Sequence, residues 1–406
     1  MSPTLLVLIL VVAAYLVGAI PFGYCLARLK GVDLFQTGSG NIGATNVGRV
    51  LGRKWGVLIF ILDFLKGVAP VALVPVILRA CPPEYSVQLQ PIDGLRVGIA
   101  LAAFLGHLFP VFLRFRGGKG VATGGGAFFV LLPGPVAISF LNWLALVVSF
   151  RYISVASILA IVGVCITRLA TMPLGEDGLI LTLFCFGGTA IVIWKHRGNL
   201  RRLTQGTESR LEERPMFDYL QRTMHLIALG LMLGSAVFFN LVAAPTIFRS
   251  LQEVAFSEPG DRTAQVPINT GLDDDKKKQL GNALAGAAVG PIFPLFFGFQ
   301  AVCGVVALIT AAGWWNGGGK ADRWRVYLTA AALATIASGW PLSKHVTSIR
   351  LARFSTDAAV AATAQADFGV WHLFSLGLSL VSLLLVIGAM LLAAKIKSPI
   401  VDSRRA

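Results

Sequence analysis

The sequence predicts an all-α polytopic membrane protein, in which a seven-helix bundle is followed by a four-helix membrane domain. Of its 406 residues, 55% are hydrophobic and only 14% are charged, whereas soluble proteins carry about 25% charged residues. Apolar runs of about 20 residues recur along the chain, and a run of that length crosses a bilayer as a helix. The formal net charge is +15, an excess that suits membrane topology, anionic lipid or an anionic substrate. This composition excludes a soluble single-core enzyme and a disordered chain.

The first half contains seven expected spans, and this odd number puts its two ends on opposite sides of the membrane. The N-terminal run MSPTLLVLIL has no basic leader and continues far beyond the length of a signal peptide's apolar region, so we expect a retained first span. Pro133-Gly134-Pro135 interrupts the segment 121–150, which predicts two short spans joined by a tight turn. The expected spans are 4–27, 55–79, 95–113, the two parts of 121–150, 152–171 and 179–194.

Basic residues orient these spans, because cytoplasmic loops of membrane proteins carry an excess of Lys and Arg. Every second connection is basic, which predicts an N-terminus outside and the glycine-rich connections inside. The basic residues of these connections are Arg28, Lys30, Arg49, Arg53, Lys54, Arg114, Arg116, Lys119, Arg151, Lys195, Arg197, Arg201 and Arg202.

A polar segment, residues 203–222, separates two apolar blocks and predicts a domain boundary near residue 215, giving domains 1–215 and 216–406. Four further spans are expected at 224–248, 286–313, 324–341 and 369–394, and they return the C-terminus to the inside. Residues 249–285 are expected to form a long external loop in which DDDKKK, residues 273–278, begins a solvated helix. The cytoplasmic tail would contain Lys395, Lys397, Arg404 and Arg405.

No metal or cofactor is implied by the sequence. The five cysteines form no CxxC pair and no zinc-like spacing, and we interpret them as small structural hydrophobes. His225 and His372 fall near opposite ends of their spans, so we expect hydrogen bonds between helices rather than a shared ion. Asp63 and Lys66, three residues apart within the second span, are expected to neutralise each other.

The first of three cytoplasmic motifs is GSGNIGATNVGR, residues 38–49. Gly38, Gly40 and Gly43 have the GxGxxG spacing, but a membrane helix precedes them, which excludes a dinucleotide-binding βαβ unit. Glycines expose backbone N–H groups, and polar side chains beside Arg49 add donors, so the segment suits a phosphate cradle. The alternative is a glycine-rich turn between helices. The added polar side chains are Ser39, Asn41, Thr45 and Asn46.

The second motif is GHLFPVFLRFRGGKGVATGGG, residues 106–126. It differs from a Walker A loop because Leu113 occupies the first glycine position. A lysine in a glycine loop at the membrane surface favours a phosphate clamp, with a positive-inside anchor as the alternative. His107 is either a functional ionisable group or a neutral imidazole bonded to a neighbouring helix. The candidate residues are Gly117, Gly118, Lys119, Gly120 and Thr123.

The third motif is WKHRGNLRRLTQGTE, residues 194–208, at the inner end of the seventh span. Taken alone, this segment is either a juxtamembrane basic anchor or part of an anion site. Its candidate residues are His196, Arg197, Asn199 and Arg201.

Together and in this order, the three motifs resemble those of the bacterial acyl-phosphate:glycerol-3-phosphate acyltransferases, the PlsY family, over residues 1 to about 212. The resemblance implies a multi-pass protein of the bacterial plasma membrane with a cytoplasmic active site. It implies transfer of a fatty acyl group from acyl phosphate to the 1-hydroxyl of glycerol 3-phosphate, giving lysophosphatidic acid and phosphate. By the same resemblance, Ser39, Arg49 and Lys119 would hold the glycerol 3-phosphate, His196 and Asn199 would orient its hydroxyls, and the glycines and Thr123 would shape the pocket.

The implied chemistry needs no covalent enzyme nucleophile, because an acyl phosphate already has a good leaving group. Clustered cations and N–H donors would offset the repulsion of two anions and stabilise the oxyanion. Either His196 or a substrate phosphate oxygen would act as the general base. The implied partners are glycerol 3-phosphate, acyl phosphate, the lipid bilayer and the soluble enzyme that supplies acyl phosphate, with no nucleic acid.

Residues 224–394 resemble a four-helix membrane family of unknown function, the transmembrane protein 205-like proteins. The matching segments are 225–248, 290–300 and 367–384. Two alternatives for the whole chain are a transporter and an interaction protein with an inactive acyltransferase-like half. A transporter would ordinarily show broken helices at the midplane and an internal repeat.

Overall fold

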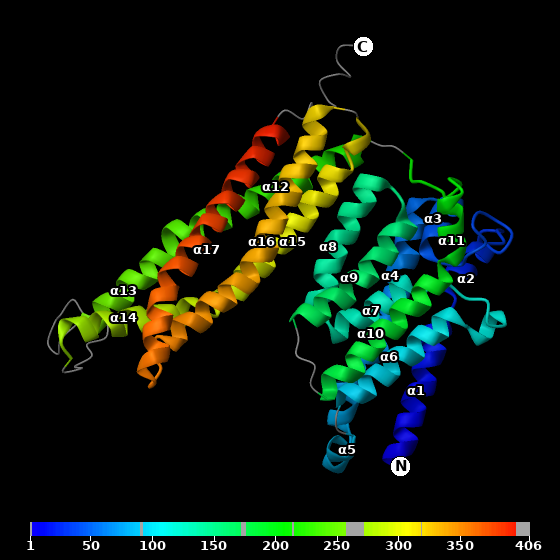
Figure 1. Ribbon diagram of the computed structural model, residues 1–406. Helices are drawn as coiled ribbons and strands as arrows, with labels where there is room; N and C mark the ends of the chain where they lie inside the picture. Colours follow the sequence, from blue (N-terminus) through cyan, green and yellow to red (C-terminus); the bar gives the residue numbers. More distant parts are fainter. Residues whose placement is uncertain are drawn as a thin grey trace. The chain divides into compact units, whose positions relative to one another are not determined.

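The computed structural model describes residues 2–89, 92–171, 176–212, 215–256, 272–317 and 319–394. Within these ranges the regular structure is helical (Figure 1). Ten helical stretches are long and apolar enough to cross a membrane, and Val121–Leu131 is a shorter apolar helix. Contacts between the helices divide the chain into two units. Unit 1 is Met1–Val147 with Arg151–Glu212, and unit 2 is Val148–Phe150 with Glu213–Ala406.

Unit 1 begins with a helix that is interrupted at Pro21. In α1 (Pro3–Ala19), Ser2 caps the N-terminus by accepting the Leu5 N–H at 3.2 Å. After the interruption, α2 (Phe22–Leu29) continues the same apolar stretch. The remaining elements of unit 1 are α3 (Ala44–Leu51), α4 (Arg53–Ala80), α5 (Pro83–Gln88), α6 (Ile92–Leu108), η1 (Val111–Leu113), α7 (Val121–Leu131), α8 (Pro133–Phe150), α9 (Ile153–Thr171), α10 (Glu176–Lys195) and α11 (Arg197–Thr204).

Glycines bring the helices of unit 1 into close backbone contact. A Cβ at Gly67 on α4 would lie 2.0 Å from the Thr123 carbonyl oxygen, and a Cβ at Gly126 on α7 would lie 2.1 Å from the Phe64 carbonyl oxygen. Small residues allow this approach between membrane helices. As a result α7, which follows the second motif, is fixed directly against α4.

The predicted break in the segment 121–150 is confirmed, because α7 ends at Leu131 and α8 begins at Pro133. The expectation of two spans is only partly met. With 11 residues, α7 is about 16 Å long at 1.5 Å per residue, which is about half of a 30 Å hydrocarbon core. Unit 1 therefore combines six long apolar stretches with one short helix.

The described part of unit 2 contains apolar helical stretches of 33 to 42 residues, which are longer than the about 20 residues that a bilayer requires. Its elements are α12 (Pro215–Phe238), the π-helix η2 (Phe239–Ala243), α13 (Ala244–Phe256), α14 (Asp274–Val289), α15 (Ile292–Ala312), the short 3-10 helix η3 (Trp315–Gly317), α16 (Lys320–Ala352) and α17 (Ala358–Ala393). In this unit α12 packs against α15 and α17, and α16 packs against α15 and α17.

The expectation of an external loop at 249–285 is wrong for the residues of this range that the structure describes. Residues up to Phe256 belong to α13 and residues from Asp274 onward belong to α14, and these two helices pack together. The expected helix start at 273–278 is confirmed, because the Asp273 carboxylate accepts the Lys276 N–H at 2.8 Å. The four basic residues expected in the cytoplasmic tail lie outside the described residues.

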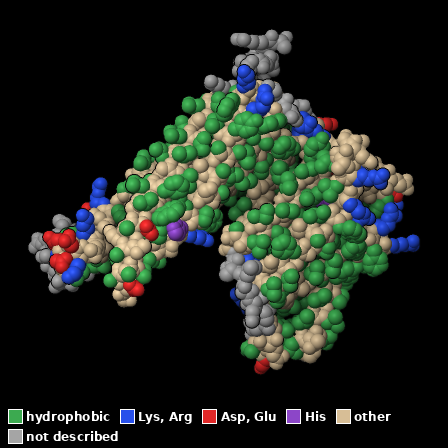
Figure 2. All heavy atoms as spheres, viewed as in Figure 1, with side chains coloured by type: hydrophobic (Ala, Val, Ile, Leu, Met, Phe, Trp, Pro, Cys, Tyr) green, Lys and Arg blue, Asp and Glu red, His purple; other side chains and the backbone are tan. Residues whose placement is uncertain are grey.

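Apolar side chains cover the flanks of the long helices in both units (Figure 2). In unit 1 the N-terminus and α5 lie at the opposite end from α3 and α11, which carry the first and third motifs (Figure 1). The described helices thus present lipid-compatible flanks and bring two of the motifs to one end of unit 1.

Candidate active site

The first motif forms a loop that wraps around the side chain of Asn46. This side chain is 1% exposed. Its Nδ2 donates to the carbonyl oxygens of Thr37 at 3.0 Å and Asn41 at 2.8 Å, and its Oδ1 accepts the Ser39 N–H at 2.8 Å. Gly38 has a φ of +66°, and a Cβ there would lie 2.3 Å from Asn46 Oδ1. Asn46 therefore organises the loop and presents Ser39 to the cavity.

The second motif forms a glycine loop that packs closely against the C-terminal end of α6. The Gly118 N–H donates to the His107 carbonyl oxygen at 3.1 Å, and a Cβ on Gly118 would lie 2.1 Å from His107 Nε2. A Cβ on Gly117 would lie 2.3 Å from the same carbonyl oxygen, and Gly120 has a φ of +84°. Only glycines allow the loop this close to α6. The loop directs Lys119 into the cavity.

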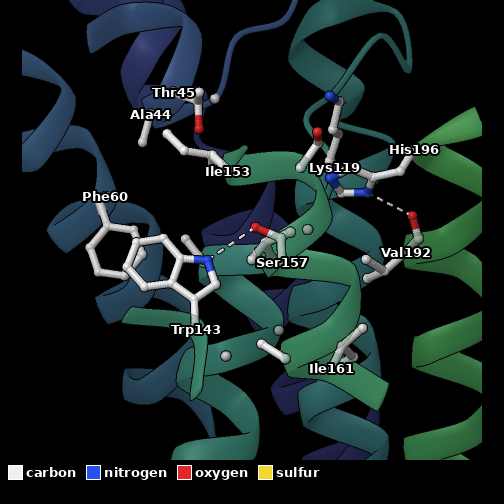
Figure 3. A pocket seen from close by; sticks show the side chains of 18 of the residues that line it. Ala44, Thr45, Phe60, Lys119, Trp143, Ile153, Ser157, Ile161, Val192 and His196 are labelled. Atoms are coloured by element: carbon white, nitrogen blue, oxygen red, sulfur yellow. Dashed lines mark hydrogen bonds between the residues drawn. The ribbon is translucent and has the colours of Figure 1, made fainter. Parts of the chain in front are cut away.

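The third motif supplies His196 and Asn199 at the start of α11. The His196 side chain is 3% exposed, and its Nδ1 lies 2.8 Å from the Val192 carbonyl oxygen (Figure 3). A carbonyl oxygen only accepts hydrogen bonds, so Nδ1 carries the proton of the neutral ring and Nε2 keeps a lone pair. That lone pair lies on the side of the ring away from Val192.

Glu208, the last residue of the third motif and not among the predicted site residues, connects that motif to Ser154 at the start of α9. Its Oε1 accepts hydrogen bonds from Asn199 Nδ2 at 2.7 Å and Ser154 Oγ at 2.8 Å, and its Oε2 accepts one from Arg202 Nε at 2.9 Å. The Lys119 ammonium donates in turn to Asn199 Oδ1. The available signal was a single acidic side chain at the end of a strongly basic segment. Ser154 lies outside the three motifs and had no such signal.

Burial and neighbouring charges shift the pKa values of these groups. Burial, with Arg202 and Arg49 nearby, lowers the pKa of Lys119 to about 8. Burial and the Lys119 charge lower the pKa of His196 to about 4, so its imidazole is neutral at pH 7. Burial alone would raise the pKa of Glu208, but hydrogen bonds from Asn199, Ser154 and Arg202 outweigh this and lower it.

These side chains surround a cavity of about 210 Å³ within unit 1. One end of the cavity, called its mouth, is polar and carries Lys119 and His196, whereas Phe60, Trp143 and Ile161 lie toward the other end (Figure 3). Arg49 also lines the cavity. Trp143 and Ser157 lie on the inner wall, where the indole Nε1 donates to Ser157 Oγ at 3.4 Å. The apolar lining includes Phe60, Phe64, Phe104, Phe128, Val136, Phe140, Ile161, Val164 and Phe184.

Most of the predicted site residues line this cavity. They are Ser39, Asn41, Thr45, Asn46, Arg49, Lys119, Gly120, His196 and Asn199. A second group does not line it and consists of Gly38, Gly40, Gly117, Gly118, Thr123, Arg197 and Arg201. Four of this group are the loop glycines, and Thr123 uses its hydroxyl to donate to the Asp63 carbonyl oxygen at 2.9 Å. Arg197 is exposed and lies over the Trp194 ring at 4.5 Å.

The predicted pairing of Asp63 with Lys66 is confirmed, and the predicted hydrogen bonding between helices is confirmed for His225, whereas for His372 it stays a prediction. Lys66 Nζ lies 2.8 Å from Asp63 Oδ1, and both side chains are about 5% exposed or less. In unit 2, His225 Nδ1 lies 3.1 Å from the Ala307 carbonyl oxygen on α15 and 3.0 Å from Thr310 Oγ1. His107 lines the cavity, with its Nδ1 3.8 Å from Asp63 Oδ1. Among the described residues, no group of three or more His, Cys, Asp or Glu is arranged to hold a metal.

A cationic mouth that opens into an apolar cavity between membrane helices fits an amphiphile with an anionic head. The site thus defines a class of membrane protein that handles lipid-like anions. The chain belongs to the glycerol-3-phosphate acyltransferase family. That family's model matches residues 8–206, and a model described as a domain of unknown function matches residues 277–355.

Relatives and solved structures match the same half of the chain. A glycerol-3-phosphate acyltransferase of Aquifex aeolicus is 44% identical over 204 residues, which are 50% of this chain and 98% of the relative. One of Desulforamulus reducens is 41% identical over 206 residues, 50% of this chain and 95% of the relative. The crystal structure of PlsY (YgiH), an integral membrane glycerol 3-phosphate acyltransferase in its glycerol 3-phosphate form, aligns with a TM-score of 0.45 at 41% identity, over 51% of this chain and 96% of that chain.

Proposed function

We propose that unit 1 transfers a fatty acyl group from acyl phosphate to the 1-hydroxyl of glycerol 3-phosphate, producing lysophosphatidic acid and inorganic phosphate for phospholipid biosynthesis. The observation that carries this proposal is the single cavity in which Arg49, Lys119, His196 and Asn199 stand at the mouth of an apolar interior. Relatives that match nearly their full length to this half of the chain bear the name glycerol-3-phosphate acyltransferase.

In this proposal Ser39, Arg49 and Lys119 hold the phosphate of glycerol 3-phosphate. Both substrates are anionic, so they approach each other only where cations offset their repulsion. Lys119 has a neutral amide oxygen as its hydrogen-bond acceptor, and this leaves its positive charge for a substrate. Glu208 neutralises Arg202 and orients Asn199, which fixes Lys119 at the mouth.

The reaction forms an ester bond between the glycerol 1-oxygen and the acyl carbon, and it breaks the bond between that carbon and the phosphate oxygen. The hydroxyl proton leaves for a base as the tetrahedral oxyanion forms, and it is finally carried by the departing phosphate or by solvent. The unprotonated Nε2 of His196 is the proposed base, with a substrate phosphate oxygen as the alternative. Lys119 and the N–H groups of the two glycine loops stabilise the oxyanion and the leaving phosphate.

The apolar interior supports a site for the acyl chain. Phe104, Phe128, Phe184 and Ile161 line it with few polar groups, and each buried CH₂ contributes about 0.8 kcal/mol. The carbonyl end of the chain would then lie near His196, at the level where the polar lining begins.

Further proposals concern the membrane location of the chain, its orientation in that membrane and its partners. We propose a bacterial plasma membrane location with seven helices in domain 1–215 and four in domain 216–406, the N-terminus outside, and the site and C-terminus in the cytoplasm. The basic connections support this orientation.

A soluble enzyme that makes acyl phosphate would supply the donor. We also propose that domain 216–406 is similar to the transmembrane protein 205-like proteins.

The test is an assay of the purified full-length chain in lipid nanodiscs with glycerol 3-phosphate and palmitoyl phosphate. Lysophosphatidic acid should appear with equimolar phosphate release in the absence of CoA. A preparation that is inert with acyl phosphate but active with acyl-CoA would contradict the proposed donor. A preparation that is inert with both would contradict the enzymatic function.

A further inference from the structure

Unit 2 contains a small polar cavity halfway along its long helices. Its volume is about 30 Å³, and a single water needs about 10–15 Å³ on such a measure, so the space admits one small ion or a few waters. The cavity lies between α12 with η2, α15, α16 and α17. Its polar lining consists of Asn240, Gln300, Thr335, Ser375, Ser379 and Ser382.

The Gln300 side chain lines this cavity. Gln300 is 3% exposed, and its Nε2 donates to the Met232 carbonyl oxygen and to Ser235 Oγ, each at 2.8 Å. Because a carbonyl oxygen only accepts, the nitrogen must be the group that faces Met232. Among the described residues, nothing donates a hydrogen bond to Gln300 Oε1, although the residue lines the cavity. This oxygen is therefore free to accept a bond from a group in the cavity.

Three other polar side chains of the lining donate to backbone carbonyl oxygens of their own helices. Asn240 Nδ2 donates to the Ala236 carbonyl oxygen at 2.8 Å. Thr335 Oγ1 donates to the Ala332 carbonyl oxygen at 2.7 Å, and Ser379 Oγ donates to that of Ser375 at 3.1 Å. Their oxygens keep free lone pairs, so the cavity is lined by hydrogen-bond acceptors.

Two of the surrounding helical stretches contain a proline beside the cavity. The π-helix η2 contains Asn240 and is followed closely by Pro245, which has no N–H for the carbonyl four residues before it. In α16, Pro341 likewise lies two residues after the lining residue Gly339. Single π-turns are frequent at functional sites, and a proline inside a helix leaves the carbonyl oxygen four residues before it without its helical hydrogen bond.

We propose that this cavity binds a sodium-sized monovalent cation. Hard cations prefer amide, hydroxyl and carbonyl oxygens, and these are the groups that line the cavity. Among its described lining residues there is no carboxylate, so the site offers no negative charge to balance a divalent ion. The rings of Phe296 and Phe297 complete the lining, and aromatic faces attract cations. This binding site is independent of the acyl transfer proposed for unit 1.

The test uses the purified full-length chain in nanodiscs and measures the binding of radioactive ²²Na⁺ by scintillation proximity, with choline chloride holding the ionic strength constant. We expect saturable binding of one ion per chain. Gln300→Leu should weaken it by about tenfold or more, equivalent to about 1.4 kcal/mol. Thr335→Val keeps the side-chain shape while removing one oxygen, and it should weaken binding as well.

The matched control is Gln221→Leu, which removes another buried amide of unit 2 whose Nε2 donates to the Thr310 carbonyl oxygen at 2.8 Å outside the cavity. This variant should keep its sodium affinity. Acyl transfer by unit 1 and a monodisperse elution profile report folding of each variant. The absence of saturable binding to the unmodified chain would mean that the cavity holds only water. Unchanged binding in both Gln300→Leu and Thr335→Val would also overturn the proposal.

Discussion

Two lysines of unit 1, Lys66 buried and Lys119 half-buried, have opposite environments. Lys66 lies within α4, 2.8 Å from the Asp63 carboxylate and 2.9 Å from the Ile20 carbonyl oxygen. Lys119 stands at the mouth of the cavity, where its hydrogen-bond acceptor is the neutral oxygen of Asn199. The charge of Lys66 is balanced by a carboxylate of the protein, whereas the charge of Lys119 is available to an anionic substrate. A half-buried cation that makes no direct ion pair is therefore the feature that distinguishes this site lysine from the structural one.

Removing Lys66 should have the largest effect, and on stability. Lys66→Met leaves the Asp63 carboxylate unpaired in the membrane interior, which costs about 3–5 kcal/mol for a buried pair. We expect a large drop in thermal unfolding temperature in detergent. The double variant Asp63→Asn with Lys66→Met removes both charges and should recover most of that loss. Equal unfolding temperatures of Lys66→Met and the unmodified chain would mean that the Asp63–Lys66 pair contributes nothing to stability.

Lys119→Ala should affect catalysis and leave stability unchanged. Removing one preorganised donor to a developing oxyanion costs about 10²–10³ in kcat, and the loss of a phosphate contact should also raise the KM for glycerol 3-phosphate. Steady-state kinetics with acyl phosphate measure both constants. Lys119 lies within 4 Å of no described acidic side chain, and its hydrogen-bond acceptor is the Asn199 amide oxygen. The unfolding temperature of Lys119→Ala should therefore stay near that of the unmodified chain. Wild-type rates in this variant would make Lys119 a simple membrane anchor.

The contrast between the two lysines was partly predictable from sequence. The Asp63–Lys66 spacing and the glycines around Lys119 predict a paired and an unpaired lysine, and the Pro133 break is likewise a local signal. The wrong expectation for residues 249–285 has a different cause. Polar residues there indicated a loop, but packing between α13 and α14 stabilises helices that their own composition does not specify. Ser154 and Glu208 meet across 54 residues of chain, and no local pattern indicates such a contact.

Glu208→Gln should weaken catalysis less than the loss of Lys119, because Glu208 acts through its neighbours. The amide keeps the size of the side chain but replaces a charged acceptor, and hydrogen bonds to charged groups contribute about 1.5–3 kcal/mol. We expect about a 10- to 100-fold lower kcat, since Asn199 and Lys119 lose their fixed orientation. Ser154→Ala removes a single neutral donor to the same oxygen and serves as the milder comparison. A normal kcat in both variants would contradict a positioning role.

The pH dependence of glycerol 3-phosphate binding should show the smallest effect and sharpen the difference between the lysines. The pKa of Lys119 is lowered to about 8, chiefly by burial, so its ammonium predominates below that pH and is lost above it. The substrate phosphate, with a second pKa of about 6, is already dianionic there. The pKa of His196, about 4, leaves its imidazole neutral throughout this range. The KM should therefore rise about tenfold between pH 7 and pH 9.

Lys119→Arg keeps its charge at these pH values, so in that variant the rise should be absent. The same rise in Lys119→Arg would assign the titration to another group.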